Sequence, residues 1–243
     1  EFDKHTGTIN TVGVGIPGSS SKETGLIKNA NSIWLNDKPF KQDLENTLGR
    51  DIRLMNDANC FALSESIDGS GRGYDSVWGV IIGSGFGGSF VYKNQVIEGV
   101  NQVAGDWGHQ PLPYPNEEEQ ELGLKCEVGN CHRPLCAEQF ISGVGFTRLF
   151  NLKYGTNFRT REIVALEANG DERAKKEFDL YEDRFARLIA IMIGIVDPDV
   201  IILGGGMSNI GRIYKNIPKI LPKYTFIDKV RNKNLRNTHG DSS

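Results

Sequence analysis

Asp57 is the first residue of this sequence whose type and position could support catalysis. It stands between a short apolar segment and an apolar helical segment, with Asn56 before it and Asn59 after it. A carboxylate at such a junction can cap the helix. It can also act as a general base that accepts the proton of a substrate hydroxyl. Both interpretations remain open from the residues alone.

Two glycine clusters follow buried apolar segments. The first runs over Gly83, Ser84, Gly85, Gly87 and Gly88, and residues 89–97 after it alternate like the second arm of a hairpin. A dinucleotide-binding fingerprint needs a helix there, so that interpretation is excluded. A glycine turn between strands can still present backbone N–H groups to a phosphate, and otherwise it is a plain tight hairpin.

The second cluster is Gly204, Gly205 and Gly206, between an apolar strand and a helical segment. Backbone amides and the helix dipole at such a place could meet a nucleotide. Three glycines exceed what a turn alone needs.

Four side chains have the types and grouping of a tetrahedral Cys₃His zinc site. They are His109, Cys126, Cys131 and Cys136. Their crowding favours a metal over disulfides, with buried free thiols as the alternative. His132 is a spare ligand, and Cys60 is expected to be a core residue.

The surrounding pattern predicts an α/β architecture, because strands that end in glycine turns alternate with helices. The predicted strands cover residues 11–16, 52–54, 77–82 and 200–203, and the predicted helices residues 60–67, 161–168, 172–196 and 210–221. Asn56 or Asp57 is the expected N-cap of the first helix. The glycines at 69–73 are a candidate domain boundary.

Composition excludes several classes of protein. Of 243 residues, 28 are Lys or Arg and 31 are Asp or Glu, so the net charge of −3 gives no footprint for nucleic acid or an anionic membrane. The longest apolar run, residues 185–196, is shorter than the roughly 20 residues that a membrane span needs. No signal peptide is visible, and we expect a cytoplasmic protein.

Seven segments together resemble the ROK family (repressors, open reading frames and kinases), and within it the bacterial fructokinases. They are GVGIPGS at 13–19, KNANSIWLN at 28–36, NDANC at 56–60, IIGSG at 81–85, AGDWGH at 104–109, FISG at 140–143 and DPDVIILGGGMSN at 197–209. They run in order over almost the whole chain, which makes the resemblance far more specific than one glycine motif.

The resemblance implies an actin-like (ribonuclease H-like) two-domain α/β fold that closes over a hexose and ATP. Asp57 matches the catalytic base, the first glycine cluster the phosphate loop and the second the loop near the adenosine. The implied sugar contacts are Asn31, Asn56, Asp106, His109 and Glu138. His109 and the three cysteines would hold a structural Zn²⁺, and Mg²⁺ would neutralise the phosphates. The implied domains are residues 1–72, 73–230 and 231–243, the last returning to the small domain.

The sequence departs from the family pattern in three ways. Asp106 replaces a Glu, and Gly129 stands where the first zinc cysteine belongs, so that Cys126 would have to supply that thiolate. The N-terminal strand with its Asp-x-Gly-Gly-Thr phosphate loop and the C-terminal Gly-Ala-Ala helix have no match. We therefore expect this chain by itself to phosphorylate sugar weakly or not at all.

The implied function is ATP-dependent phosphorylation of fructose, and also of mannose, at the 6-hydroxyl. N-acetylglucosamine kinase or glucokinase of the same family is the alternative, since sugar choice can depend on a few hydroxyl contacts. A sugar-sensing ROK repressor without its DNA-binding module is a second alternative, and a zinc-stabilised binding protein a third. A homodimer is expected from the family.

Overall fold

A computed structural model describes residues 10–123 and 133–240, together with residues 3, 5, 7, 8 and 131. It divides into two units, Glu1–Cys60 and Phe61–Ser243, and each is described by itself. The division falls within one helix, α3 (Asp57–Ile67). The three sequence-based domains, with a boundary after residue 72, stay a prediction.

The first unit is a small α/β body. Strands β1 (Val12–Ile16) and β4 (Ile52–Asn56) pair in parallel, and β2 (Ser19–Ser20) pairs antiparallel with β3 (Ile27–Lys28). Between them lie η1 (Ile33–Leu35) and α2 (Phe40–Leu48). Its buried core is formed by Ile16, Ile27 and Ala30, with Val14, Leu35, Phe40 and Leu54 packed around them.

The second unit is built on a five-stranded sheet of order β7-β6-β5-β8-β9. These strands are β5 (Ser76–Ile82), β6 (Phe86–Tyr92), β7 (Gln95–Val96), β8 (Val200–Gly204) and β9 (Lys233–Arg236). β5 and β6 form an antiparallel hairpin, whereas β5 and β8 are parallel, with Ile81 opposite Gly204. The carboxyl ends of β5 and β8 therefore lie at the same edge of the sheet. In open α/β sheets this is the edge where ligands bind.

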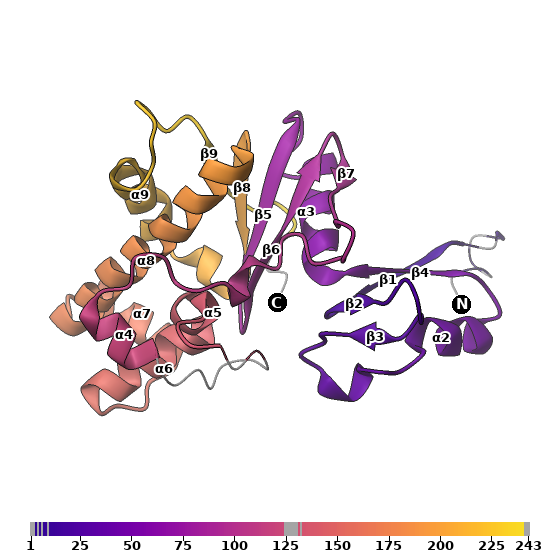
Figure 1. Cartoon of the computed structure of the whole chain (residues 1–243), viewed down its shortest axis with the longest axis horizontal. Coiled ribbons are helices and arrows are strands. Elements are labelled where there is room, and N and C mark those ends of the chain that lie inside the picture. Colours follow the sequence, from indigo (N-terminus) through magenta and orange to yellow (C-terminus); the bar gives the residue numbers. More distant parts are fainter. Residues whose placement is uncertain are drawn as a thin grey trace. The chain divides into compact units, whose positions relative to one another are not determined.

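Helices cover both faces of this sheet (Figure 1). One face carries the larger core, to which α5 (Ala137–Ile141), α6 (Gly143–Tyr154), α7 (Thr160–Ala168), α8 (Glu172–Val196) and α9 (Gly211–Ile220) contribute. On the other face Phe61 and Ala62 of α3 pack against Val77, Val91, Val200 and Ile202. A Cβ on Gly79 would lie 2.6 Å from the Cβ of Ala62, so α3 rests directly on β5.

Helix α8 anchors the segment that follows His109. Arg187 donates to the carbonyls of Pro113 and Tyr114, each over 2.7 Å. Arg184 and Arg187 also bind the buried carboxylate of Glu119, which lies in α4 (Glu117–Gly123). Burial alone would raise the pKa of Glu119, but hydrogen bonds from the two arginines hold it below its usual value. This buried ion network holds Glu119 of α4 and the backbone of Pro113 and Tyr114 against α8.

The structure confirms the predicted strands and helices to within a few residues, and it corrects one turn. Gly87 and Gly88 lie inside β6, opposite Ile81 and Val80, so the turn contains only residues 83–85. Among the described residues, no helix has the length and apolar character needed to cross a membrane.

Candidate active site

Asp57 lies where β4 passes into α3. Its Oδ1 accepts the N–H of Ala58 over 2.8 Å, and the residue is exposed to solvent. Partial desolvation by the surrounding protein raises the pKa of Asp57 above the ordinary value of 3.8, against the lowering effect of the Ala58 N–H. A raised pKa together with an accessible carboxylate is the combination that a general base requires.

Asn56, not Asp57, caps the helix. The Oδ1 of Asn56 accepts the N–H of Asn59, three residues on, over 3.2 Å, while its Nδ2 donates to the carbonyl of Gly18 over 3.0 Å. Gly18 has φ +72°, and a Cβ there would collide with the backbone of Lys28. The side chain of Asn56 thus links the Gly18 turn to α3 and serves as the N-cap of the helix. The capping interpretation of Asp57 is correspondingly weakened.

The loop that holds Asn31 is closed by Asn36, a residue that the sequence did not single out. Asn36 accepts the N–H of Ala30 over 2.9 Å and donates to its carbonyl over 3.1 Å. Asn31 is exposed beside this closure, as is Trp34. Asn31 therefore sits on an ordered loop with its side chain accessible.

The two glycine turns of the second unit touch each other. Gly205 has φ +79°, and a Cβ on it would lie 2.5 Å from the carbonyl oxygen of Ile82 and 2.8 Å from the nitrogen of Gly83. Gly204 is buried against the ring of Phe61, while Gly206 is exposed at the start of η3 (Gly206–Asn209). The structure thus brings both predicted nucleotide-binding turns to one edge of the sheet.

Within the first turn the N–H of Gly83 donates to the carbonyl oxygen of Gly85 over 3.0 Å, and Ser84 is exposed. The amide of Gly143, the first residue of α6, donates to the carbonyl of Gly83 over 2.8 Å. Gly88 is buried beside two indole rings. A Cβ there would lie 2.9 Å from the indole nitrogen of Trp107 and 3.2 Å from that of Trp78. Gly88 serves close packing, whereas Gly83, Gly85 and Gly87 are half-buried and Ser84 is exposed.

His109, Cys131 and Cys136 come together as a candidate metal site, with their ligand atoms within 4.8 Å of one another. The two sulfurs lie 3.5 Å apart, and Cys136 Sγ lies 3.7 Å from His109 Nδ1. A tetrahedral zinc with bonds of about 2.3 Å to sulfur and 2.0 Å to nitrogen separates its ligands by about 3.5–3.8 Å. The distances from Cys136 to the other two ligands therefore fit zinc. Cys126, Gly129 and His132 lie outside the described residues.

The segment that carries Asp106 and His109 lies on the backbone of β6. Side chains at Gly105 and Gly108 would collide with the carbonyls of Gly88 and Phe86, so only glycine permits this approach. The η2 turn (Trp107–His109) directs His109 Nδ1 to the cysteines, and Nε2 lies 3.9 Å from Oδ1 of Asp106. Asp106 is 46% exposed and His109 27%, so both remain accessible to a ligand.

Glu138 is the buried member of the predicted sugar site, only 5% exposed. Its Oε2 accepts the backbone N–H of Phe86 over 3.0 Å. Glu138 thus connects the residues beside the candidate metal site with the end of the Gly83–Gly85 turn, a contact that sequence spacing gave no means to predict. Asp57, Asn56 and Asn31 belong to the first unit, and all the other predicted site residues that the structure describes belong to the second.

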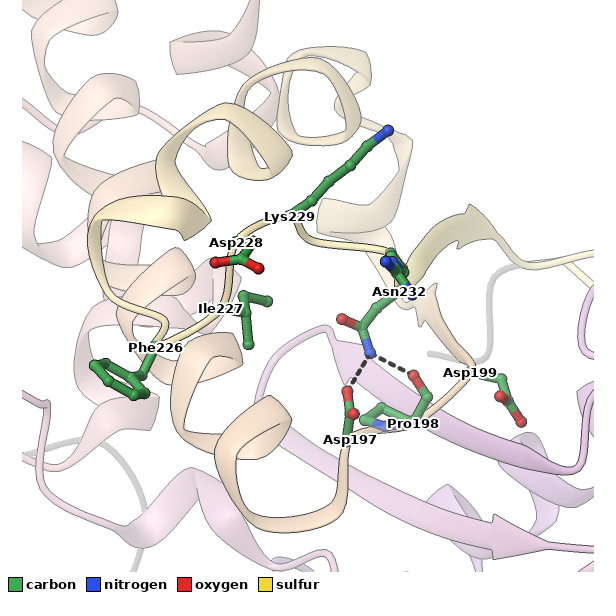
Figure 2. A pocket seen from close by; sticks show the side chains of 9 residues that line it. Asp197, Pro198, Asp199, Phe226, Ile227, Asp228, Lys229 and Asn232 are labelled. Atoms are coloured by element: carbon green, nitrogen blue, oxygen red, sulfur yellow. Dashed lines mark hydrogen bonds between the residues drawn. The ribbon is translucent and has the colours of Figure 1, made fainter.

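A separate pocket of about 490 Å³ lies at the amino ends of β8 and β9, between Asp197–Asp199 and the segment 226–232 (Figure 2). The side chain of Asn232 bridges it by donating to Asp197 Oδ1 over 3.0 Å and to the carbonyl of Pro198. None of the predicted site residues lines this pocket.

Comparison with known proteins gives the family. The model of the ROK family matches residues 1–243. An N-acetyl-D-glucosamine kinase of Vibrio cholerae is 36% identical over 247 residues, covering 100% of this chain and 80% of the relative. One of Escherichia coli O1:K1 is 36% identical over 242 residues, again covering 100% and 80%.

Among solved structures, a ROK hexokinase from Thermus thermophilus aligns with a TM-score of 0.81 at 25% identity, over 97% of this chain and 76% of that one. The actin-like sugar kinase fold that the sequence predicted is confirmed. The relatives do not support the fructokinase branch and favour the N-acetylglucosamine alternative. The chain therefore belongs to the ROK family, and the relatives named above are sugar kinases.

Proposed function

We propose that this protein is an ATP-dependent sugar kinase that phosphorylates N-acetylglucosamine. Two relatives named N-acetyl-D-glucosamine kinase are 36% identical to the chain over its whole length. The structural observation that carries the kinase assignment is the carboxylate of Asp57, which is solvent-accessible and has a raised pKa. Because Asn56 caps α3, Asp57 is not needed as the helix cap. Fructose, our first expectation, becomes the alternative substrate.

In the proposed reaction a sugar hydroxyl, the one at carbon 6, attacks the γ-phosphorus of ATP. A new P–O bond forms to the sugar, the bond to the β,γ-bridging oxygen breaks, and ADP leaves. Asp57 accepts the hydroxyl proton and so orients the nucleophile. Such bases typically contribute about 10²- to 10⁴-fold to the rate. Mg²⁺ that arrives with ATP supplies charge neutralisation.

The two glycine turns are the proposed nucleotide site. Gly205 and Gly206 would lie near the adenosine, and the backbone of residues 83–85 near the phosphates. Their position at the carboxyl edge of β5 and β8 supports this assignment, since ligands of open α/β sheets bind there. Gly143 begins a 12-residue helix whose amino end faces the same turn, which favours negative charge.

The proposed sugar contacts are the accessible side chains of Asn31, Asn56, Asp106 and His109, together with the buried carboxylate of Glu138. His109 would also hold a structural Zn²⁺ with Cys131 and Cys136, and Cys126 is the proposed fourth ligand. Zinc would stabilise the conformation of the segment around His109 and would take no part in the phosphoryl transfer itself. A cytoplasmic location and a homodimer stay predictions.

A panel of sugars tests the proposal. Full-length protein should release ADP from MgATP with N-acetylglucosamine in preference to fructose, mannose and glucose. The Asp57→Asn variant, which keeps the shape of the side chain, should bind the sugar and turn it over poorly. A folded protein that binds these sugars and phosphorylates none of them would support the sugar-sensor alternative instead.

A further inference from the structure

Helix α5 joins the candidate metal site to the Gly83–Gly85 turn. It has only five residues, Ala137–Ile141, and it begins directly after Cys136 and ends one residue before Ser142, the N-cap of α6. The candidate metal site would bind a metal ion, whereas the Gly83–Gly85 turn would bind a nucleotide.

The amino end of α5 is held by the candidate metal site. Cys136 Sγ lies 3.7 Å from His109 Nδ1 and 3.5 Å from Cys131 Sγ. The N–H of Ala137 donates to the carbonyl of Gln110, next to His109, over 2.8 Å. A metal shared by these ligands would thus fix the position of the first residue of α5.

The other contacts of α5 hold the turn. Oε2 of Glu138 accepts the N–H of Phe86 over 3.0 Å, and both groups are buried. The N–H of Gly143 donates to the carbonyl of Gly83 over 2.8 Å. Gly143, which follows α5, therefore holds Gly83, the first residue of the turn. Glu138 of α5 holds Phe86, the residue that follows the turn.

The helix between these ends has little freedom to absorb a displacement. All five of its residues are buried, and the hydroxyl of Tyr181 in α8 donates to the carbonyl of Ile141 over 3.1 Å. Close-packed interiors transmit displacements because they contain few voids. A shift of Cys136 would accordingly move Glu138 and loosen its bond to Phe86.

We propose that α5 is a rigid link through which metal at His109, Cys131 and Cys136 fixes the Gly83–Gly85 turn, with Glu138 as the positioning residue. Metal occupancy then sets the affinity for the nucleotide as well as for the sugar. The inference rests on the proposed function, because it takes the turn to contact ATP.

The first test measures binding of Mg²⁺ with AMPPNP, a non-hydrolysable ATP analogue, to full-length protein by titration calorimetry without sugar. Protein loaded with one zinc per chain is compared with protein stripped by a chelator. Removal of the metal should raise the Kd for AMPPNP about tenfold, and hydrogen exchange should show faster exchange of the Phe86 amide. Unchanged affinity in a stripped protein that keeps its circular dichroism spectrum overturns the proposal.

The second test uses zinc-loaded Glu138→Gln, which keeps the shape but replaces a charged acceptor with a weaker neutral one. Its Kd for AMPPNP should rise about fivefold, and stripping its zinc should add little, because the link is already impaired. Glu172→Gln, an exposed carboxylate at the start of α8, is the matched control and should behave like wild type. If the stripped wild type unfolds, zinc-loaded Glu138→Gln decides alone, and an unchanged Kd contradicts the proposal.

These measurements separate the link from the proposed function. The absence of sugar removes any effect of Glu138 on sugar binding. If wild-type protein binds no AMPPNP, the kinase proposal fails. If it binds AMPPNP equally well with and without zinc, the kinase proposal stands and only the link is wrong.

Discussion

Gly205 lies directly against Gly83, so closely that a Cβ on Gly205 would come within 2.8 Å of the Gly83 nitrogen. Residues separated by more than a hundred positions meet because β5 and β8 are parallel neighbours and both end at this edge. The contact explains the excess of glycine in the second cluster. One glycine provides the positive φ and the close approach, while its neighbours pack on Phe61 or stay open to solvent.

Replacement of Gly205 by alanine should therefore disable the nucleotide site. At φ +79° and ψ 168° the backbone lies in a region that essentially only glycine adopts, so alanine costs about 1–3 kcal/mol there, and the overpacking adds about 1–3 kcal/mol. We expect a Kd for AMPPNP raised at least tenfold and a lower midpoint in urea unfolding. Gly211→Ala is the control, since a Cβ there meets nothing within 4 Å. Equal behaviour of the two variants would contradict the close contact.

Asp57→Asn should lose activity without losing stability. Removal of the base is expected to lower kcat by about 10²- to 10⁴-fold. Because the pKa of Asp57 is higher in the folded than in the unfolded protein, its charge costs stability above the folded pKa, and this cost vanishes below the unfolded one. The variant should therefore match or exceed wild type in thermal unfolding at pH 7 and lose that advantage in acid. Asp51→Asn, at an exposed position just before β4, is the control for both readouts.

The pH dependence of the reaction gives an independent check on Asp57. The carboxylate must be ionised to accept a proton, so kcat/KM should fall as the pH drops through its pKa. Since desolvation raises that pKa, the acid limb should lie above the ordinary value of 3.8. Initial rates from pH 4 to 8 at saturating MgATP locate it. An acid limb at or below 3.8 would show that Asp57 is not the titrating base.

Cys131→Ser should release the metal. Loss of a ligand is expected to weaken zinc binding by more than the roughly 10–100-fold that the loss of an outer contact costs. Metal content measured by atomic absorption should fall from one zinc per chain toward none, with a lower melting temperature. Cys60→Ser is the matched control, because that thiol lies on α3 and burial raises its pKa. Zinc retained by Cys131→Ser would remove this residue from the ligand set.

The sequence was sufficient to predict the strands and helices of the sheet because their periodicity is strong and their ends carry glycine, asparagine or aspartate. Residues 77–82 and 200–203 correspond to β5 and β8 within one residue at each end. The extent of the first glycine turn was wrong, since Gly87 and Gly88 were assigned by residue type. Gly88 packs in β6 against Gly105, Trp78 and Trp107, which come from other parts of the chain, and Gly87 beside it pairs with Ile81.

The candidate site was only partly accessible to sequence reasoning. Whether Asn56 or Asp57 caps α3 is decided by side-chain geometry, and the bond from Phe86 to Glu138 joins residues 52 positions apart. The preferred sugar was least accessible. The seven motif segments together resembled the fructokinases, whereas the relatives over the whole chain favour N-acetylglucosamine. A few hydroxyl and amide contacts decide this choice, and they leave little trace in the motifs that define the family.

A competition experiment tests the central assignment most directly. Full-length protein receives equal concentrations of N-acetylglucosamine and fructose with limiting MgATP, and mass spectrometry quantifies the two sugar phosphates. Their ratio reports the ratio of kcat/KM values. We predict at least a tenfold excess of N-acetylglucosamine phosphate and almost no product of either kind with Asp57→Asn. An excess of fructose phosphate would contradict the proposed substrate, and full turnover by Asp57→Asn would contradict the proposed base.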